Sequence, residues 1–498
     1  MREKVLIPNR GVVALDIINS LQSIGLEATL MYSPEDSNSL AVKLADRSYK
    51  FFSSKLEDSY LDIDSIIEKA IELNVDYIHP GYGFLAENPE FAKTCEDNNI
   101  KFIGPNYELL EIIEDKLKLR KIAEELGIDI IKHSEVLFSA IDFEDLENDF
   151  TYPIIIKPLK GLGGRGINIA DYKKDVSHLI SDLFKREKNR KNGLFIEEFY
   201  SKAHHIEVPF FRDIDGNILI LPEIESSVQR RFQKVFQESP SININDIVRK
   251  KMFDNTVKLI NNLDYVGLGY VEFIVDNNKI YFSEINPTFQ INTLISEVQI
   301  AANLIKKQFA ISRGELLNKV KGVKIVEPSH HVLLVSLMAE NPYKNFSPSS
   351  GVVTDFYHYS VIRNIFKTNI YTGAKISPVY DPYIGKILTF SKIRDNAIAD
   401  MRKFLDNIII RGINTNLIFL KHLLESKELR QGDTIIDFLN LKCEFKKRKP
   451  KSSELEIAAT VLGSYFHIEN RKKNYKSKLE KIRQPGFVKR LIYKLRGE

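Results

Sequence analysis

The chain has 498 residues, enough for about three domains, and its 43% hydrophobic and 28% charged residues are typical of a globular protein and exclude a chain disordered throughout. The net charge of +4 is unevenly spread, because residues 446–498 carry 16 Lys and Arg against 5 Asp and Glu, whereas the remainder carries 55 against 62. We therefore expect a mildly acidic body that does not bind nucleic acid, followed by a basic tail for which such binding stays open.

The cysteine content and the apolar runs indicate a compartment. Cys95 and Cys443 lie in no CxxC or Cys/His cluster, so neither a disulfide framework nor a structural zinc is expected. Arg10 and Asp16 interrupt the apolar stretch that a signal peptide needs, and the apolar run 332–339 is far short of a membrane span. We expect a cytoplasmic protein without a membrane segment.

The first hundred residues alternate strand and helix patterns. They predict, in chain order, a strand at 4–8, a helix at 12–24, a strand at 27–32, a helix at 59–73 and a short strand at 75–79. This alternation predicts a parallel α/β sheet. Ligands of such sheets bind beyond the carboxyl ends of the strands, so the loops at residues 9–11 and 79–84 are candidate binding segments.

The middle of the chain predicts strands and hairpins. Residues 107–126 predict one or two helices that lead into a second domain. The pattern then predicts strands at 152–157, 195–199 and 205–211, and hairpins around 215–217 and 276–278. A third α/β region is predicted over about 326–442, before a Lys-rich stretch of helix and loop.

The first chemical motif is Lys157 followed by a glycine-rich loop at 161–166. Glycines let a loop bring its backbone N–H groups to phosphates, and a lysine adds a positive charge. The pattern is neither a Walker A loop nor a GxGxxG turn that enters a helix, so by itself it fits a surface hairpin equally well.

A second motif combines Glu272, Glu284 and Asn286 on the two strands of a predicted hairpin. Carboxylate and amide oxygens are the hard ligands that Mg²⁺ takes together with nucleotide phosphates. Simple alternation toward solvent would also explain the carboxylates. Their largely apolar flanks favour carboxylates that are paired or metal-bound. Two other segments are ambiguous when taken singly. Residues 79–87 also fit a simple turn at a helix start, and residues 229–234 also fit a solvated basic face.

The order of these segments resembles the biotin carboxylase family of ATP-grasp enzymes over about residues 1–445. The matching segments include Asn9-Arg-Gly11, His79-Pro-Gly-Tyr-Gly-Phe-Leu-Ala-Glu-Asn88, Ile156-Lys157, Gly163-Gly-Arg-Gly166, His205-Ile-Glu207, Gln229-Arg-Arg231, Glu284-Ile-Asn286 and Ile384-Gly-Lys386. The resemblance implies an α/β (α+β) fold with three domains: a pre-ATP-grasp domain at 1–113, an ATP-grasp domain at 114–325 and a C-terminal domain at 326–445. The ATP-grasp domain would carry a lid at about 131–203. The basic tail at 446–498 either docks a partner or is solvated.

In that family, Mg-ATP and bicarbonate form carboxyphosphate, whose CO₂ carboxylates biotin on a carrier protein. The resemblance therefore implies ATP and Mg²⁺ (or Mn²⁺) as cofactors. It assigns phosphate binding to Lys116, Lys157, Gly163 and Gly164, adenine binding to Glu197, Glu198 and Tyr200, and ribose or phosphate contact to His205 and Gln229. It assigns the metal to Glu272, Glu284 and Asn286, and bicarbonate to Lys234, Gln290 and the Ile291 backbone.

Three positions depart from the family pattern. The family's catalytic base falls on Asn292, its bicarbonate arginine on Thr288 and its biotin arginine on Ser336. An amide cannot abstract a proton, and a hydroxyl cannot replace a guanidinium fork. A general base is typically worth roughly 100- to 10,000-fold. A phosphate-contacting histidine is also replaced, by Phe232, and Lys160 and Leu162 lie near the lid glycines.

Three hypotheses follow. We interpret the chain as an ATP-dependent ligase, the carboxylase subunit of an acyl-CoA carboxylase, in which another group replaces the base. The alternative is a carboxylation-deficient, nucleotide-binding paralogue that acts as a regulatory or structural subunit. A third is a ligase with another acceptor.

Partners also follow from the resemblance. The tail has no Met-Lys-Met biotin acceptor, so the expected partners are a biotin carrier protein and a carboxyltransferase subunit. A homodimer or a heteromer with an active biotin carboxylase stays open, because Asp16 and Asn19 occupy positions where the family's interface region carries arginines.

Overall fold

The computed structural model describes residues 2–144, 146, 149–160, 166–185, 191–317, 320–359, 363–445, 460–462, 464 and 467–469. The chain divides into two units, Met1–Phe445 and Lys446–Glu498. Within the described part of the second unit, residues 460–462, 464 and 467–469 are helical. No helix among the described residues has the length and apolar character needed to cross a bilayer.

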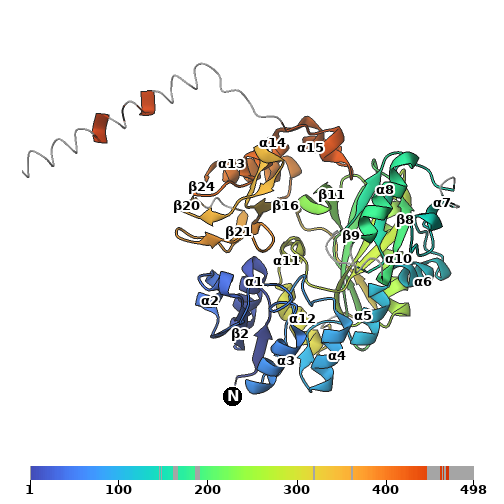
Figure 1. Ribbon diagram of the computed structural model, residues 1–498, viewed down its shortest axis with the longest axis horizontal. Helices are drawn as coiled ribbons and strands as arrows, with labels where there is room; N and C mark the ends of the chain where they lie inside the picture. Colours follow the sequence, from blue (N-terminus) through green and yellow to red (C-terminus); the bar gives the residue numbers. More distant parts are fainter. Residues whose placement is uncertain are drawn as a thin grey trace, which may run out of the picture. The chain divides into compact units, whose positions relative to one another are not determined.

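The first unit begins with the predicted parallel sheet (Figure 1). Its strand order is β3-β2-β1-β4-β5, from β1 (Lys4–Ile7), β2 (Glu27–Tyr32), β3 (Arg47–Lys50), β4 (Tyr77–Ile78) and β5 (Lys101–Phe102). The accompanying helices are α1 (Gly11–Gln22), η1 (Pro34–Asp36), α2 (Leu40–Leu44), α3 (Ile63–Glu72) and α4 (Pro89–Asp97). Every pairing is parallel, so the predicted α/β arrangement is confirmed.

Capping side chains set the helix boundaries here. α3 begins at Ile63, later than predicted, because the Asp62 side chain accepts a hydrogen bond from the Ser65 backbone N–H and caps the helix. Asn88 caps α4 in the same way, with Pro89 at the first helical position. Residues 79–88 therefore lead from the carboxyl end of β4 into a helix.

The connection at 107–126 is two helices, α5 (Tyr107–Glu114) and α6 (Lys116–Glu125). Asp115 separates them with an extended backbone (φ −83°, ψ 96°), and its carboxylate accepts from the Lys118 N–H. An aspartate is favoured at such an N-cap. Lys116 thereby stands in the first turn of α6.

A small antiparallel sheet follows, in the order β7-β6-β8. Its strands are β6 (Ile154–Pro158), β7 (Asn168–Ala170) and β8 (Leu194–Glu198), and the neighbouring helices are α7 (Ile141–Glu144) and α8 (Lys173–Phe184). Ile154, Ile156 and Leu194 share a core with Val176 and Ile180 of α8. This core fixes Lys157, which follows Ile156 on β6.

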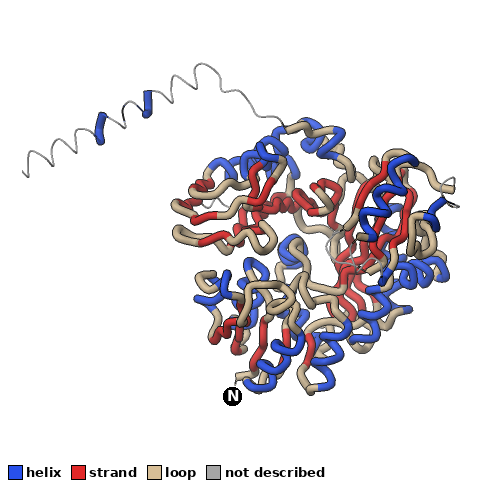
Figure 2. Tube along the Cα trace, in the orientation of Figure 1, coloured by secondary structure: helices blue, strands red, loops and turns tan. Residues whose placement is uncertain are grey.

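A ten-stranded sheet follows, built from strands between residues 204 and 391. Its strands are among those drawn in red in Figure 2. Its path is β14-β13-β9-β11-β12-β16-β23-β21, and β10 and β15 pair beside β9. The bounds are β9 (His204–Arg212), β10 (Ile218–Ile220), β11 (Ile224–Arg230), β12 (Gln233–Ser239), β13 (Gly267–Asp276), β14 (Lys279–Asn286), β15 (Val323–Ile325), β16 (His331–Met338), β21 (Asn364–Thr368) and β23 (Tyr383–Ser391). The helices here are α10 (Asp246–Asn262), α11 (Thr293–Ile300) and α12 (Leu304–Ser312).

Both predicted hairpins are present in this sheet, as β9–β10 and β13–β14. The segment 229–234 is a third hairpin turn: β11 ends at Arg230, and Arg231 and Phe232 turn with φ of 50° and 63° before β12. Such a turn brings Gln229 opposite Lys234. The basic segment 229–234 therefore forms the turn and the flanking strand ends of the β11–β12 hairpin.

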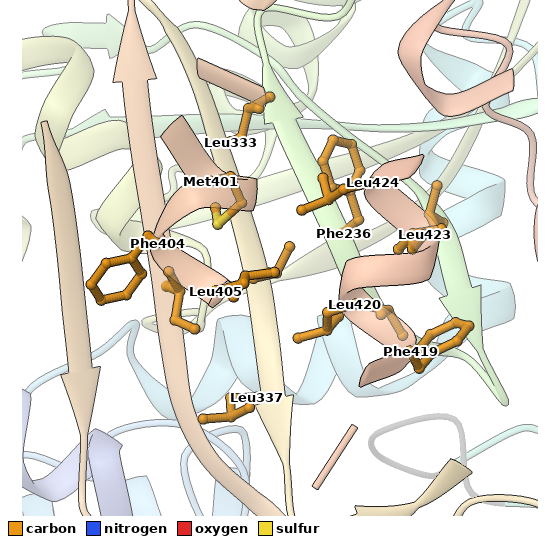
Figure 3. Packing of buried hydrophobic residues seen from close by; sticks show 14 of the residues in the cluster. Phe236, Leu333, Leu337, Met401, Phe404, Leu405, Phe419, Leu420, Leu423 and Leu424 are labelled. Atoms are coloured by element: carbon orange, nitrogen blue, oxygen red, sulfur yellow. The ribbon is translucent and has the colours of Figure 1, made fainter. Parts of the chain in front are cut away.

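In the C-terminal part of the first unit, the helices α13 and α14 pack on this sheet. Its remaining elements are β17 (Glu340–Asn341), η2 (Pro342–Lys344), β18 (Ser347–Pro348), β19 (Gly351–Val352), β20 (Asp355–His358), β22 (Lys375–Ile376), β24 (Ile408–Arg411), α13 (Arg394–Asp406), α14 (Leu417–Glu425), α15 (Lys427–Arg430) and α16 (Phe438–Leu441). Figure 3 shows this packing through Phe236, Leu333, Leu337, Met401, Phe404, Leu405, Leu420, Leu423 and Leu424. Each fully buried leucine contributes roughly 1.5–3 kcal/mol.

Candidate active site

The β13–β14 hairpin sets two carboxylates against each other. Glu272 on β13 pairs in register with Glu284 on β14, and Tyr270 pairs with Asn286. Side chains two residues apart on a strand share a face, so Glu284 and Asn286 project to the same side. Like charges directly opposite on neighbouring strands are destabilising unless they are compensated.

Glu272 is the centre of a hydrogen-bonded network. Lys234 Nζ lies 2.7 Å from Glu272 Oε1, and His205 Nε2 lies 2.6 Å from Oε2. Asn286 Nδ2 donates to Oε1 at 2.7 Å. Burial acts to raise the pKa of Glu272, but Lys234 and His205 outweigh it and hold that pKa well below its usual range.

Lys234 lies between two buried carboxylates, 2.7 Å from both Glu207 and Glu272. Burial disfavours its charge, yet these carboxylates raise its pKa above the ordinary value. His205 behaves alike: burial lowers its pKa, and Glu272 more than restores it. Gln229 Nε2 lies 2.6 Å from His205 Nδ1 and extends the network to β11.

The predicted phosphate lysine Lys157 belongs to a second cluster. Its Nζ contacts Glu197 Oε2, and Arg120 of α6 contacts Glu197 Oε1. Burial would raise the pKa of Glu197, but the two cations lower it to about 2. The Glu197 carboxylate, expected beside adenine, is thus engaged by two cations.

The other predicted nucleotide residues are spread around these clusters. Glu198 Oε2 accepts from the Tyr200 hydroxyl at 3.0 Å, and the Tyr200 ring lies 5.3 Å from that of Tyr281. Lys116, in the first turn of α6, carries a charge that partly opposes the rise in the pKa of Glu87. The predicted Gly163 and Gly164 lie outside the described residues.

The predicted bicarbonate residues connect to Glu87. Gln290 Nε2 donates to Thr288 Oγ1 at 3.0 Å, and Thr288 Oγ1 donates to Glu87 Oε1 at 3.2 Å. Burial, followed by the charge of Glu284, raises the pKa of Glu87 to about 7. A carboxyl group of this kind exchanges its proton near neutral pH.

The other two positions that are predicted to depart from the family pattern, Asn292 and Ser336, have different surroundings. Asn292 Nδ2 donates to Glu207 Oε2 at 2.9 Å, and its Oδ1 has no hydrogen-bond partner within the described part of the chain. Ser336 lies on β16, opposite Lys386 of β23, and its carbonyl accepts from Asn416 Nδ2 at 2.9 Å. Both side chains are buried.

The donor set fits a hard divalent cation that also binds phosphates. Within the described ranges, no three His, Cys, Asp or Glu side chains gather as a metal site by themselves. The set here is two opposed carboxylates and one amide. Burial is the main cause of the raised pKa of Glu87, and the charge of Glu284 adds to it. Mg²⁺ commonly takes one or two carboxylates and completes its shell with phosphates and water.

Four residues of these networks were not among the predicted site residues. Glu87, Glu207 and Lys386 lie inside segments that match the family, and this position was the signal in the sequence that could have identified them as site residues. Arg120 carried none, because one arginine on an amphipathic helix predicts a solvated face. Its burial against Glu197 follows only from packing between α6 and β8.

Comparisons with known protein families cover most of the chain. Residues 1–110 match the family described as "Biotin carboxylase, N-terminal domain". Residues 115–320 match "Carbamoyl-phosphate synthase L chain, ATP binding domain". Residues 335–441 match "Biotin carboxylase C-terminal domain".

Individual proteins that are similar over most of this chain are also biotin carboxylases. Biotin carboxylase 1 of Bacillus subtilis (strain 168) is 34% identical over 444 residues, which are 88% of this chain and 98% of the relative. Biotin carboxylase of Pseudomonas aeruginosa is 32% identical over 449 residues, which are 89% of this chain and 99% of the relative.

Solved structures are also similar. A biotin carboxylase–β,γ-ATP complex from Campylobacter jejuni has a TM-score of 0.82 at 30% identity and covers 88% of this chain and 99% of that one. A second structure is the biotin carboxylase domain dimer of Hydrogenobacter thermophilus 2-oxoglutarate carboxylase, in complex with MgADP and bicarbonate. It has a TM-score of 0.83 at 28% identity, and the match covers 88% of this chain and 97% of that one. The chain therefore belongs to the biotin carboxylase family of ATP-grasp proteins.

Proposed function

We propose that this protein binds Mg-ATP and uses it for the bicarbonate-dependent carboxylation of biotin on a separate carrier protein. One observation carries the proposal: Lys234, His205 and Asn286 converge on Glu272. Metal, nucleotide and bicarbonate residues predicted from separate motifs are thereby joined in one network. Gln229 and Glu207 extend it on either side.

The residues divide the work by their chemistry. Lys116 and Lys157 are suited to the ATP phosphates, and Glu272, Glu284 and Asn286 would hold Mg²⁺. The metal would neutralise phosphate charge and polarise the phosphoryl group. Gln290 supplies an amide donor for bicarbonate, and Lys234 supplies a positive charge held in place by two carboxylates.

Bicarbonate must lose a proton when it attacks the phosphoryl group, and Asn292 cannot take it. We propose that Glu87 takes this proton. Hydrogen bonds through Thr288 and Gln290 connect Glu87 to the bicarbonate position, and the pKa of Glu87, about 7, suits a base at neutral pH. Glu87→Gln should lower bicarbonate-dependent turnover by about 100-fold or more. Unchanged turnover would assign the proton to another group.

The deciding experiment measures ATP hydrolysis by the purified protein without bicarbonate, with bicarbonate, and with bicarbonate plus free biotin. Carboxylation predicts hydrolysis that bicarbonate stimulates and biotin increases further. Incorporation of ¹⁴C from bicarbonate into biotin gives the direct readout. Absence of both contradicts the proposal.

A second function is favoured by the acceptor side of the site. Thr288, Asn292 and Ser336 are neutral and buried, and Thr288 and Asn292 are hydrogen-bonded to carboxylates. A non-carboxylating paralogue that binds nucleotide and regulates an active subunit would have these properties. Mg-dependent ATP binding without turnover, together with co-purification of an intact biotin carboxylase, would support this alternative.

The proposed partners are a biotin carrier protein and a carboxyltransferase subunit of an acyl-CoA carboxylase. The proposed location is the cytoplasm, which fits Cys95 and Cys443, both free and buried. Co-purification of a biotinylated protein, detected with streptavidin, tests the carrier. Biotinylation of this chain itself would contradict a separate carrier.

A further inference from the structure

The buried side chain of Asp16, on α1, forms ion pairs with two lysines of the C-terminal part of the sheet. Asp16 lies 2.7 Å from Lys386 Nζ on β23 and 3.0 Å from Lys367 Nζ on β21. Glu297 of α11 lies 3.7 Å from Lys367. Two acidic and two basic groups therefore balance each other where α1, the sheet and α11 meet.

Lys386 connects this network to the bicarbonate segment. Its Nζ donates to the Ile291 carbonyl at 3.2 Å and lies 5.5 Å from the centre of the Phe289 ring. Phe289 and Ile291 flank Gln290, whose side chain donates to Thr288. The Lys386 ammonium group thus contacts the Ile291 backbone and the Phe289 ring, on either side of the residue proposed to bind bicarbonate.

The position of Lys386 depends on Asp16. Lys386 is buried, and a buried ammonium that loses its counter-ion is strongly destabilised or moves toward water. Lys367 adds a second positive charge close by, since Asp16 pairs with both lysines. Without Asp16, Lys367 would keep its contact with Glu297, whereas Lys386 would lose the carboxylate that it pairs with.

We propose that Asp16 is a positioning residue: by holding Lys386, it fixes the backbone at Phe289–Ile291 and thereby the bicarbonate contact of Gln290. The inference rests on the proposed function for its kinetic consequence. It adds that helix α1 of the N-terminal part controls the geometry of the acceptor side.

The test compares Asp16→Asn with a matched control, Glu238→Gln. Glu238 is also a buried carboxylate in an ion pair, and it binds Arg394, at 2.6 Å, rather than any group of the 288–292 segment. Asp16→Asn should raise KM for bicarbonate by about tenfold or more, since a displacement of about 1 Å can cost a hundredfold. The Kd for MgADP should stay within about threefold, because the nucleotide contacts are elsewhere.

Hydrogen–deuterium exchange supplies a readout that needs no turnover. Backbone amides of residues 288–293 should exchange about tenfold faster in Asp16→Asn than in the wild type, whereas Glu238→Gln should leave them unchanged. The charge-balanced variant Asp16→Asn/Lys367→Gln removes one charge of each sign and should show the same effects if the single variant fails to fold.

Equal exchange in wild type and both Asp16 variants overturns the proposal, and so does equal loosening by Glu238→Gln. A KM for bicarbonate that rises together with the Kd for MgADP also overturns it, because that pattern indicates general damage. If the wild type shows no bicarbonate-dependent turnover, the proposed function fails, and the exchange comparison still decides the role of Asp16.

Discussion

Glu272 and Glu284 stand directly opposite each other on β13 and β14, and Lys234 and His205 bind the Glu272 carboxylate. Like charges directly opposite on neighbouring strands are destabilising unless a cation compensates them. The proposed Mg²⁺ would add positive charge at this carboxylate pair. Because Glu272 is already held by cationic side chains, Glu284 is the position at which metal binding is best tested.

Glu284→Gln should weaken MgADP binding by about tenfold or more and leave metal-free ADP binding nearly unchanged, since an amide loses the charge that Mg²⁺ requires. Isothermal titration with and without Mg²⁺ measures both. Asp276→Asn, at the far end of the same hairpin, is the matched control and should bind as the wild type does. Equal loss with and without Mg²⁺ would contradict a metal role.

Arg120→Met should destabilise the protein by about 1–3 kcal/mol, because the buried Glu197 carboxylate loses one of its two cationic contacts and keeps Lys157. Arg47→Met removes an exposed arginine paired with Glu27 and should cost at most about 1 kcal/mol. Urea unfolding monitored by circular dichroism compares the two variants. Similar losses would mean that the Arg120 pair is no stronger than a surface one.

Burial lowers the pKa of His79 to about 3 from its ordinary 6.5. The unfolded chain therefore binds a proton that the folded chain does not, and stability falls as pH decreases from about 6.5 to about 3, by about 1.4 kcal/mol per pH unit. His79→Asn keeps an acceptor for the Gly81 N–H and removes the titrating group. The variant should show a shallower decline in unfolding free energy over this pH range.

The control for this prediction is His178, whose side chain is exposed on α8. His178→Asn should leave the acid dependence as in the wild type. A wild-type slope retained by His79→Asn would assign the acid sensitivity to other groups.

Restoring the family's charged groups should increase carboxylation. If the wild type is the non-carboxylating paralogue, the variant Thr288→Arg/Asn292→Glu/Ser336→Arg should fix ¹⁴C-bicarbonate onto free biotin at least about tenfold faster than the wild type, since a general base alone is worth roughly 100-fold or more. Thr288→Arg/Ser336→Arg, without the base, should gain less. A stably folded triple variant that is no faster would show that these positions do not limit the reaction.

Local patterns in the sequence predicted most of the N-terminal sheet and the hairpins. Strands such as Glu27–Tyr32 were found at their observed bounds, because their apolar residues and turn signals lie within a few positions of each other. Helix starts were less exact: α3 begins at Ile63 because of the Asp62 cap. Motif order predicted the family and assigned Lys234, His205, Asn286 and Glu272 to one site, and the structure shows that the first three contact Glu272.

The amino-acid sequence shows which chemical groups are present, and its resemblance to the family predicts that Thr288, Asn292 and Ser336 stand where the family has charged groups. The burial of Arg120 on Glu197 and the pairing of Asp16 with Lys386 became visible only in the folded chain. Residues 16 and 386 lie far apart in the chain, so no local periodicity reports their pairing. Such pairs escape sequence patterns because the cost of burying a charge depends on the partner that folding brings to it.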